Sequence, residues 1–252
     1  RYLQEMESVD WIFIDPARRD GRGGKTVAIS DCEPDVSALE DLLLEKAPHV
    51  LVKLSPKLDL ALALHDLKHV QVAHIVSVNN ECKELLLVLG RETHLSSEEV
   101  PIHCINLITS QTTQCLLFTR QQEKEYSCPY TSTLKTYLYE PNASILKAGA
   151  FRSVSSIYNV EKLHPNSHLY TSDEYIPDFP GRRFLITGSS SLNKKELKEL
   201  LGTGKKANLT VRNFPASVAE LRKRLKLAEG GDTYLFATTL ANEKKVLIIC
   251  QP

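Results

Sequence analysis

The sequence predicts an α/β fold with a parallel sheet, followed by smaller α+β units. In the first part of the chain, short runs of β-branched and aromatic residues alternate with segments of helical periodicity. In the last part, strands and helices follow one another at short intervals. The 252 residues, 42% of them apolar, are enough to bury a core. The longest apolar runs fall far short of the roughly 20 residues of a membrane helix, so no membrane partner is predicted.

The first elements alternate between strand and helix. Residues 9–15 are apolar and end at Asp15-Pro16, which predicts a buried strand, because proline cannot continue a central ladder. Apolar residues at helical spacing predict a helix that Pro34-Asp35 opens and Pro48 ends. A second buried strand is predicted at 49–54 and a second helix at 58–67. This order predicts parallel pairing through right-handed crossovers.

Two hairpins are predicted next. The strands 70–78 and 84–89 flank Asn79-Asn80, residues that suit a tight turn, and we place this hairpin at the edge of the sheet. The strands 105–109 and 115–119 form the second hairpin. The pattern then becomes irregular, which predicts a first domain at 1–119 and a connecting domain at 120–180, with helix within 143–158.

Residues 181–252 predict a compact α+β domain. Its expected elements are strands at 183–187, 207–211, 233–239 and 245–250, and helices at 193–201 and 217–225. This segment carries 14 Lys and Arg against 6 Asp and Glu, a net charge of +8, whereas residues 1–180 carry −8. Such asymmetry indicates a basic domain that binds a polyanion. The alternative is a solvated charged surface.

Residues that directly follow parallel strands are the first candidates for a site, because ligands bind at the carboxyl ends of such strands. Asp15, Pro16, Arg18 and Arg19 follow the first strand, and Ser55 follows the second. The Asp15 carboxylate can accept hydrogen bonds from an amine or a hydroxyl, and the arginines can hold a phosphate. The alternative is that Asp15 caps a turn and the arginines are solvated.

The stretch Asp10-Trp11-Ile12-Phe13-Ile14-Asp15-Pro16-Ala17-Arg18 resembles the fourth motif of class I, S-adenosylmethionine-dependent methyltransferases. The resemblance implies that the chain is the C-terminal half of this Rossmann-like sheet. Asp15 would then lie beside the methyl donor and the acceptor. Ala17 departs from the Asp-Pro-Pro pattern of many nucleic-acid enzymes, which weighs against methylation of an exocyclic amine. Uracil-C5 methylation needs a nucleophilic cysteine where this chain has Ser55.

The resemblance becomes narrower towards the end of the chain. Residues 76–85 (VSVNNECKEL), 209–215 (LTVRNFP) and 244–249 (KKVLII) are similar to a bacterial family of methyltransferase-like proteins that end in a THUMP-like domain. This implies a ferredoxin-like domain at about 120–180 and a THUMP-like domain at 181–252. It also implies an RNA partner, tRNA or rRNA. Clustered Lys and Arg residues support RNA binding through release of counterions.

The resemblance leads to a methyltransferase that acts on RNA. The catalytic residues would be Asp15, Pro16 and Arg18, and the substrate-binding residues would be Arg19, Ser55, Lys205, Lys206, Arg212, Arg222 and Lys223. The donor would be S-adenosylmethionine, whose glycine-rich turn and acidic ribose ligand we expect upstream of Arg1. The alternative is a non-catalytic protein that binds RNA or protein on a degenerate methyltransferase fold.

Other chemistries are disfavoured by their spacing. Gly21 to Thr26 imitates the end of a P-loop, but Arg19 stands where the first glycine is required. The histidine pairs lack the glutamate of a zinc-protease motif, so no metal site is predicted. The six cysteines form no C-x-x-C pair, which favours a reducing cytoplasm. The sequence predicts no oligomeric state.

Overall fold

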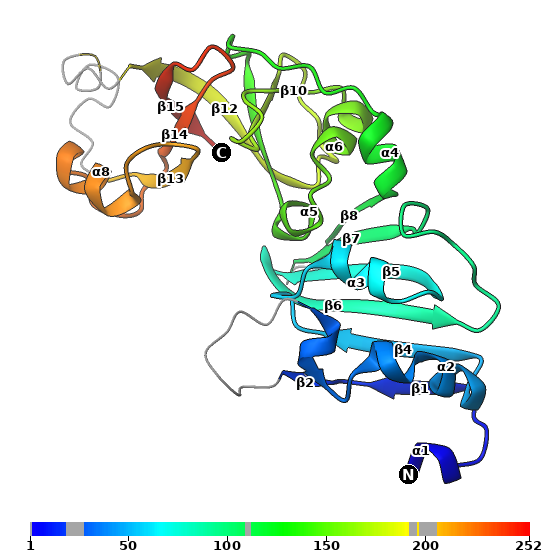
Figure 1. The fold of residues 1–252 in the computed structure, drawn as a ribbon. Helices are drawn as coiled ribbons and strands as arrows, with labels where there is room; N and C mark the ends of the chain where they lie inside the picture. Colours follow the sequence, from blue (N-terminus) through cyan, green and yellow to red (C-terminus); the bar gives the residue numbers. More distant parts are fainter. Residues whose placement is uncertain (1, 19–27, 109–111, 192–195, 197–205) are drawn as a thin grey trace. The chain divides into compact units, whose positions relative to one another are not determined.

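The computed structural model describes residues 2–18, 28–108, 112–191, 196 and 206–252 (Figure 1). These residues form a mixed α/β fold of two compact units, each built around its own large sheet. The first unit comprises residues 1–125 and 142–150, and the second comprises residues 126–141 and 151–252. The helix predicted at 193–201 and the glycine-containing loop at 21–26 lie outside the described residues, apart from residue 196.

The first unit contains a six-stranded sheet in the order β1-β4-β6-β5-β7-β8. Its strands are β1 (Trp11–Ile14), β4 (His49–Leu54), β5 (Val70–Val78), β6 (Glu81–Gly90), β7 (Ile102–Leu107) and β8 (Thr113–Phe118). The helices are α1 (Tyr2–Glu5), α2 (Val36–Lys46), α3 (Leu60–Asp66), α4 (Arg120–Glu125) and α5 (Ala143–Ala148). A short ribbon, β2 (Ala17–Arg18) with β3 (Cys32–Glu33), and the 3-10 turn η1 (Ile29–Asp31) complete it.

The strand directions confirm the parallel pairing that the sequence predicts. β1 pairs in parallel with β4, and β5 pairs in parallel with β7. The prediction that the β5–β6 hairpin lies at the edge was wrong. β6 runs antiparallel between β4 and β5, and β7 and β8 extend the sheet beyond β5. Asn79 and Asn80 both have positive φ, of 49° and 64°, which allows the tight turn between these long strands.

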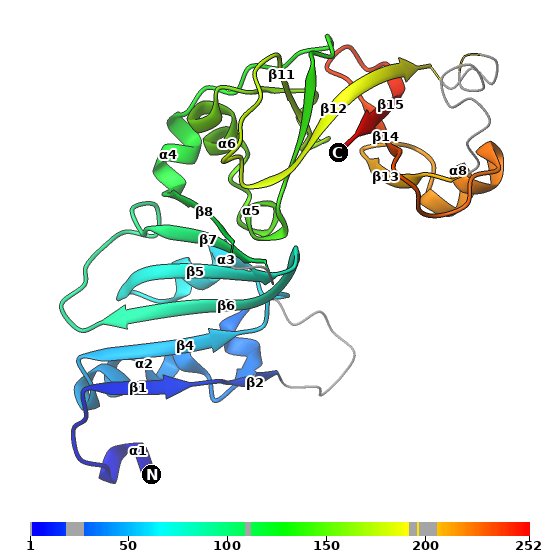
Figure 2. The same ribbon diagram turned by 180° about the vertical axis from the view of Figure 1, so that it is seen from behind.

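The two faces of this sheet differ. On one face Val52, Leu54 and Leu87 are at most 1% exposed, and α2 and α3 cover this side (Figures 1 and 2). The other face, here called the open face, holds residues that pair in register across the strands: Trp11, Phe13, His49, Leu51, Lys53, Val72, His74, Glu84, Leu86, Val88, His103 and Leu117.

The open face corrects the prediction that residues 9–15 and 49–54 are buried strands. Trp11 and Phe13 are 55% and 61% exposed, and β4 alternates between half-buried and buried residues. The reason is that β1 lies at the sheet edge, and that the side chains of a strand alternate between the two faces. Apolar sequence alone does not reveal whether both faces are covered.

Side-chain caps explain why the helices of the first unit begin where they do. Asp35 accepts hydrogen bonds from the backbone N–H groups of Ser37 and Ala38 at the start of α2. Asp59 accepts one from Leu62 at the start of α3. Each cap satisfies a backbone donor that has no partner within the helix. These caps orient the helices that follow β1 and β4, and so shape the edge where those strands end.

The second unit contains a seven-stranded sheet in the order β10-β11-β9-β12-β15-β14-β13. Its strands are β9 (Tyr137–Pro141), β10 (Glu161–Lys162), β11 (Tyr170–Ser172), β12 (Gly181–Ser190), β13 (Asn208–Arg212), β14 (Tyr234–Thr239) and β15 (Lys245–Gln251). The helices are α6 (Phe151–Tyr158) and α8 (Val218–Leu225). β13 and β14 are parallel and joined through α8, whereas the other neighbouring strands run antiparallel.

The second sheet buries apolar residues on both faces. Leu235 and Ala237 of β14 pack with Leu221 of α8 on one face. Phe236 packs with Phe184 and other residues on the opposite face. Because β14 lies between β15 and β13 and its side chains alternate, consecutive residues supply two separate cores. Among the described residues, no helix is long and apolar enough to cross a membrane.

Candidate functional site

Three charged side chains form a row across neighbouring strands of the first sheet. Asp15 directly follows β1, Lys53 lies in β4, and Glu84 lies in β6. Lys53 donates a hydrogen bond from Nζ to Asp15 Oδ2 at 2.8 Å, and its Nζ lies 3.9 Å from Glu84 Oε2. The register explains the row, because Ile14 pairs with Val52, which places Asp15 beside Lys53. The site is thus a carboxylate, an ammonium group and a second carboxylate on the open face.

The row remains accessible and charged. Half of the Asp15 side chain and about a third of the Lys53 side chain (34%) are exposed. The hydrogen bond to Asp15, followed by the attraction of Glu84, raises the pKa of Lys53 above its usual range. Lys53 therefore stays protonated and orients the Asp15 carboxylate through its Oδ2 atom. Such a carboxylate can accept a hydrogen bond from an amine or a hydroxyl.

Sequence reasoning missed Lys53 and Glu84. A lysine inside the apolar strand 49–54 was the available signal, since a charged residue in a strand predicted to be buried needs a partner. Its partner, Asp15, lies 38 positions away in the sequence. Strand register was needed to join them.

The other predicted residues of this site lie near the same edge. Pro16 is buried, and the backbone of Arg18 pairs with Cys32 in the β2–β3 ribbon. Ser55 follows β4, the parallel neighbour of β1, and its Oγ accepts a 3.4 Å hydrogen bond from the Lys57 backbone N–H. Arg19 lies outside the described residues. The structure thus brings Asp15, Pro16 and Ser55 to the carboxyl ends of two adjacent parallel strands.

A polar network anchors α5 at the carboxyl ends of β5 and β7. Asn106 accepts a hydrogen bond from the Asn80 backbone N–H at 2.9 Å, and Asn80 accepts one from the Ala143 backbone N–H at 2.8 Å. Lys147 of α5 donates to the Leu58 carbonyl oxygen at 2.7 Å. These bonds join segments far apart in the sequence. Their role is structural, because they hold α5 against the sheet of the first unit.

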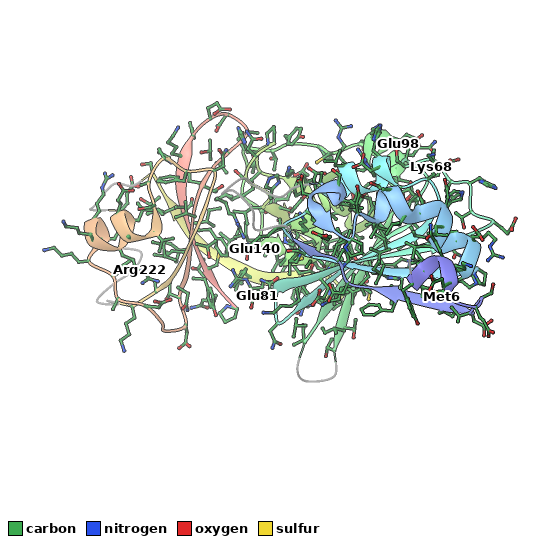
Figure 3. The ribbon with its side chains drawn as sticks, turned by 60° about the horizontal axis from the view of Figure 1, so that its bottom comes forward. Met6, Lys68, Glu81, Glu98, Glu140 and Arg222 are labelled. Carbon is green, nitrogen blue, oxygen red and sulfur yellow. The ribbon has the colours of Figure 1, made fainter. Side chains whose placement is uncertain are left out.

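The basic residues of the second unit fall into two groups. Lys206 is exposed, and Arg222 and Lys223 lie on α8, which Figure 3 shows with Arg222 labelled. Lys205 lies outside the described residues. Arg212 is held instead by Glu140, which is 2% exposed: the Arg212 Nη2–Glu140 Oε1 distance is 2.9 Å.

Glu140 also receives hydrogen bonds from Arg182, through Nε at 2.8 Å and through Nη2. The two arginines compensate the free-energy cost of removing the Glu140 carboxylate from water. The second unit thus contains an internal ion cluster of Arg182, Glu140 and Arg212, in addition to the exposed basic residues. The Arg212 guanidinium is therefore already paired within the protein and is less available to bind a phosphate.

The helix α8 presents the exposed basic residues on a well-capped element. Ser217 and Glu220 form a reciprocal capping box at its start, and Leu221 is its single buried residue. Arg222 Nη1 donates to the Ala207 carbonyl oxygen at 3.3 Å. Basic residues in the last turn interact favourably with the helix dipole. Within the described part of the chain, no group of three or more His, Cys, Asp or Glu residues is arranged to hold a metal ion.

Two segments of the chain match models of known domains. Residues 137–180 match the model of a ferredoxin-like domain, and residues 181–252 match the model of a THUMP-like domain. No curated protein matches the chain.

One solved structure, described as "putative methyltransferase from Porphyromonas gingivalis W83", is 44% identical with a TM-score of 0.88. The match covers 96% of this chain and 59% of that protein, so the chain spans less than two thirds of its relative. At this identity the likeness extends through both units described above. The chain is therefore similar to a protein described as a methyltransferase, and its residues 137–180 and 181–252 match a ferredoxin-like and a THUMP-like domain.

Proposed function

We propose that the intact protein transfers a methyl group from S-adenosylmethionine to RNA. The observation that carries the proposal is the accessible Asp15 carboxylate, which directly follows a parallel strand and is oriented by Lys53 at 2.8 Å. In parallel sheets this edge is where ligands bind. The likeness to a protein described as a methyltransferase supports the same reaction class.

Each residue of the site has a distinct task in this proposal. Asp15 accepts a hydrogen bond from the acceptor group, and Lys53 holds the Asp15 carboxylate in place. Pro16 restricts the backbone that follows, and Arg18 and Arg19 hold a phosphate of the substrate. Ser55 contacts the substrate from the neighbouring strand. Catalysis is then mainly positioning of the acceptor in line with the methyl group.

S-adenosylmethionine supplies an electrophilic methyl group when it is bound. Asp15 and Ser55 fit the acceptor side of such a site, because both lie at the carboxyl ends of β1 and β4 and are accessible. We place the glycine-rich turn that the resemblance to class I methyltransferases implies for the donor in a part of the intact protein other than the residues described here. The residues described here are therefore proposed to contact the acceptor.

The THUMP-like domain supports RNA as the substrate. Exposed Lys206 and Lys223 and half-buried Arg222, together with Lys205, would contact phosphates. Arg212 would contribute less, because its guanidinium is already paired with Glu140. Phosphate contacts of this kind position an RNA without reading its sequence.

The test uses the full-length protein with radiolabelled S-adenosylmethionine and total RNA. Asp15→Asn should lower methyl transfer at least 100-fold and leave donor affinity by calorimetry within about twofold, since only acceptor contacts are lost. Asp10→Asn is the matched control, because Asp10 is exposed at the other end of β1, and it should retain activity. Lys53→Met should lower transfer about tenfold through misplacement of Asp15.

Two results would contradict the proposal. One is wild-type protein that binds RNA but neither binds the donor nor transfers a methyl group, which would support the non-catalytic alternative. The other is Asp15→Asn with the activity of the wild type, which would remove Asp15 from the site.

A further inference from the structure

The second unit contains a cavity of about 600 Å³ at the carboxyl ends of the parallel strands β13 and β14. Asn213 and Phe214 directly follow β13, and Thr239 ends β14. Lys245 begins β15 and pairs with Thr239. The cavity is completed by His164, Asn166, Val211, Pro215 and Glu243. Its volume lies within the range of small-ligand sites, about 300–1,000 Å³.

Hydrogen bonds fix the histidine that lines this cavity. The His164 side chain is 9% exposed, and its Nδ1 accepts from the backbone N–H of Asn166 and from Asn213 Nδ2, both at 3.0 Å. The proton of the ring therefore lies on Nε2, which donates to Glu243 Oε1 at 2.9 Å. Glu243 is thus oriented while 76% of its side chain stays exposed.

Hydrogen bonds also fix Thr239 and Asn213, which line the cavity beside His164. Thr239 Oγ1 donates to the Asn213 carbonyl oxygen at 2.5 Å, and Ser167 Oγ donates to the Thr239 carbonyl oxygen at 2.7 Å. Asn213 adopts a left-handed backbone conformation, with φ of 52°, which turns the chain into the cavity wall. A site held by such bonds loses little conformational entropy when a ligand binds.

The lining combines an aromatic ring with polar groups of both charges. Phe214 is half-buried against the apolar core and leaves part of its ring exposed. Asn213 and Asn166 offer amides, Glu243 a carboxylate, and Lys245 an ammonium group. Aromatic rings stack on unpaired bases, amides and carboxylates bind base edges, and lysine binds phosphate. A fully double-stranded RNA cannot insert a base into such a cavity.

We propose that this cavity binds one unpaired nucleotide of an RNA, with the base near Phe214 and Glu243 and a phosphate near Lys245. This inference rests on the proposed RNA function. The Glu243 carboxylate repels phosphate and accepts N–H donors, so it favours a base with such donors on its Watson–Crick edge. Guanine presents two of them side by side and fits best.

The test measures fluorescence anisotropy of the chain with two labelled RNAs, a blunt duplex and the same duplex with an unpaired guanosine tail. Wild-type protein should bind the tailed duplex at least tenfold more tightly. Phe214→Leu and Glu243→Gln should each remove most of this difference and leave affinity for the blunt duplex unchanged. In Glu243→Gln the side-chain carbonyl oxygen can still accept the His164 hydrogen bond, so the cavity should keep its shape. Asp232→Asn, which alters an exposed carboxylate outside the cavity, should behave as the wild type.

A second comparison separates this cavity from general RNA binding. Lys223→Glu should weaken the binding of both duplexes equally, because it removes a phosphate contact on α8. Equal wild-type affinity for the two duplexes would overturn the cavity proposal and leave the RNA function standing. Failure to bind either duplex would overturn both. Guanosine and uridine tails of equal affinity, unchanged by Glu243→Gln, would also overturn the assigned role of Glu243.

Discussion

The two sheets of this protein differ in how many of their faces are covered. β14 in the second unit contributes Leu235 to one core and Phe236 to the other, and both residues are 0% exposed. β1 in the first unit leaves Trp11 and Phe13 more than half exposed on the open face. The second sheet therefore supplies its own cores. The first sheet keeps apolar side chains exposed, and covering them lowers the free energy of the protein.

Two phenylalanines test this difference with the largest expected effect. Phe236→Ala should destabilise the second unit by about 3–5 kcal/mol, because it removes a fully buried ring and leaves a cavity. Phe13→Ala should change the stability of the first unit by no more than about 0.5 kcal/mol, because its ring is 61% exposed. Hydrogen exchange of the β14 and β1 amides, read by mass spectrometry, reports the two units separately. Equal losses at both positions would contradict the comparison.

An intermediate effect is expected on self-association of the 252-residue chain. The open face offers apolar side chains to a second copy, so Phe13→Ser or Leu117→Ser should each weaken association by about tenfold, or about 1.4 kcal/mol. Sedimentation velocity over a concentration series measures this change. Tyr2→Ser is the control, because Tyr2 is 81% exposed but lies outside the sheet. A wild-type chain that stays monomeric at high concentration would show that the open face does not mediate self-association.

The smallest effect concerns pH and the second unit. Burial, with help from the charges of Lys162 and Arg212, lowers the pKa of His168 from 6.5 to about 4. The unfolded chain then binds more protons than the folded one between pH 6.5 and 4. Stability should therefore fall as pH drops through this window and level off below it. Since His168 is only partly buried, the slope should stay below about 1 kcal/mol per pH unit.

Denaturant midpoints at pH 7 and pH 4.5 measure this contribution. His168→Asn should flatten the difference, and asparagine tolerates the left-handed backbone that His168 adopts, with φ of 53°. His65→Asn is the control, because the His65 side chain is 81% exposed. A pH dependence unchanged in His168→Asn would assign the acid sensitivity to other groups.

Much of the candidate site could be predicted before the structure. Asp15 and Ser55 were placed at strand ends from apolar runs broken by proline, and the structure puts both strands in parallel. Lys53 and Glu84 were missed, because their proximity to Asp15 depends on strand register. The cavity around His164 was also missed, because it joins residues up to 81 positions apart that have no common motif.

Local physics explains what the sequence determined by itself. Periodicity, proline breaks and capping residues act over a few positions, so most strands and helices outside residues 120–180 and the turn at Asn79-Asn80 were readable from the chain. The strands β9, β10 and β11 were not predicted. The charge asymmetry of the last 72 residues was equally visible. The tertiary structure decided which faces are covered, that β6 lies between β4 and β5, and that Arg212 pairs with Glu140. These features depend on contacts between distant segments, and no local pattern in the sequence encodes them.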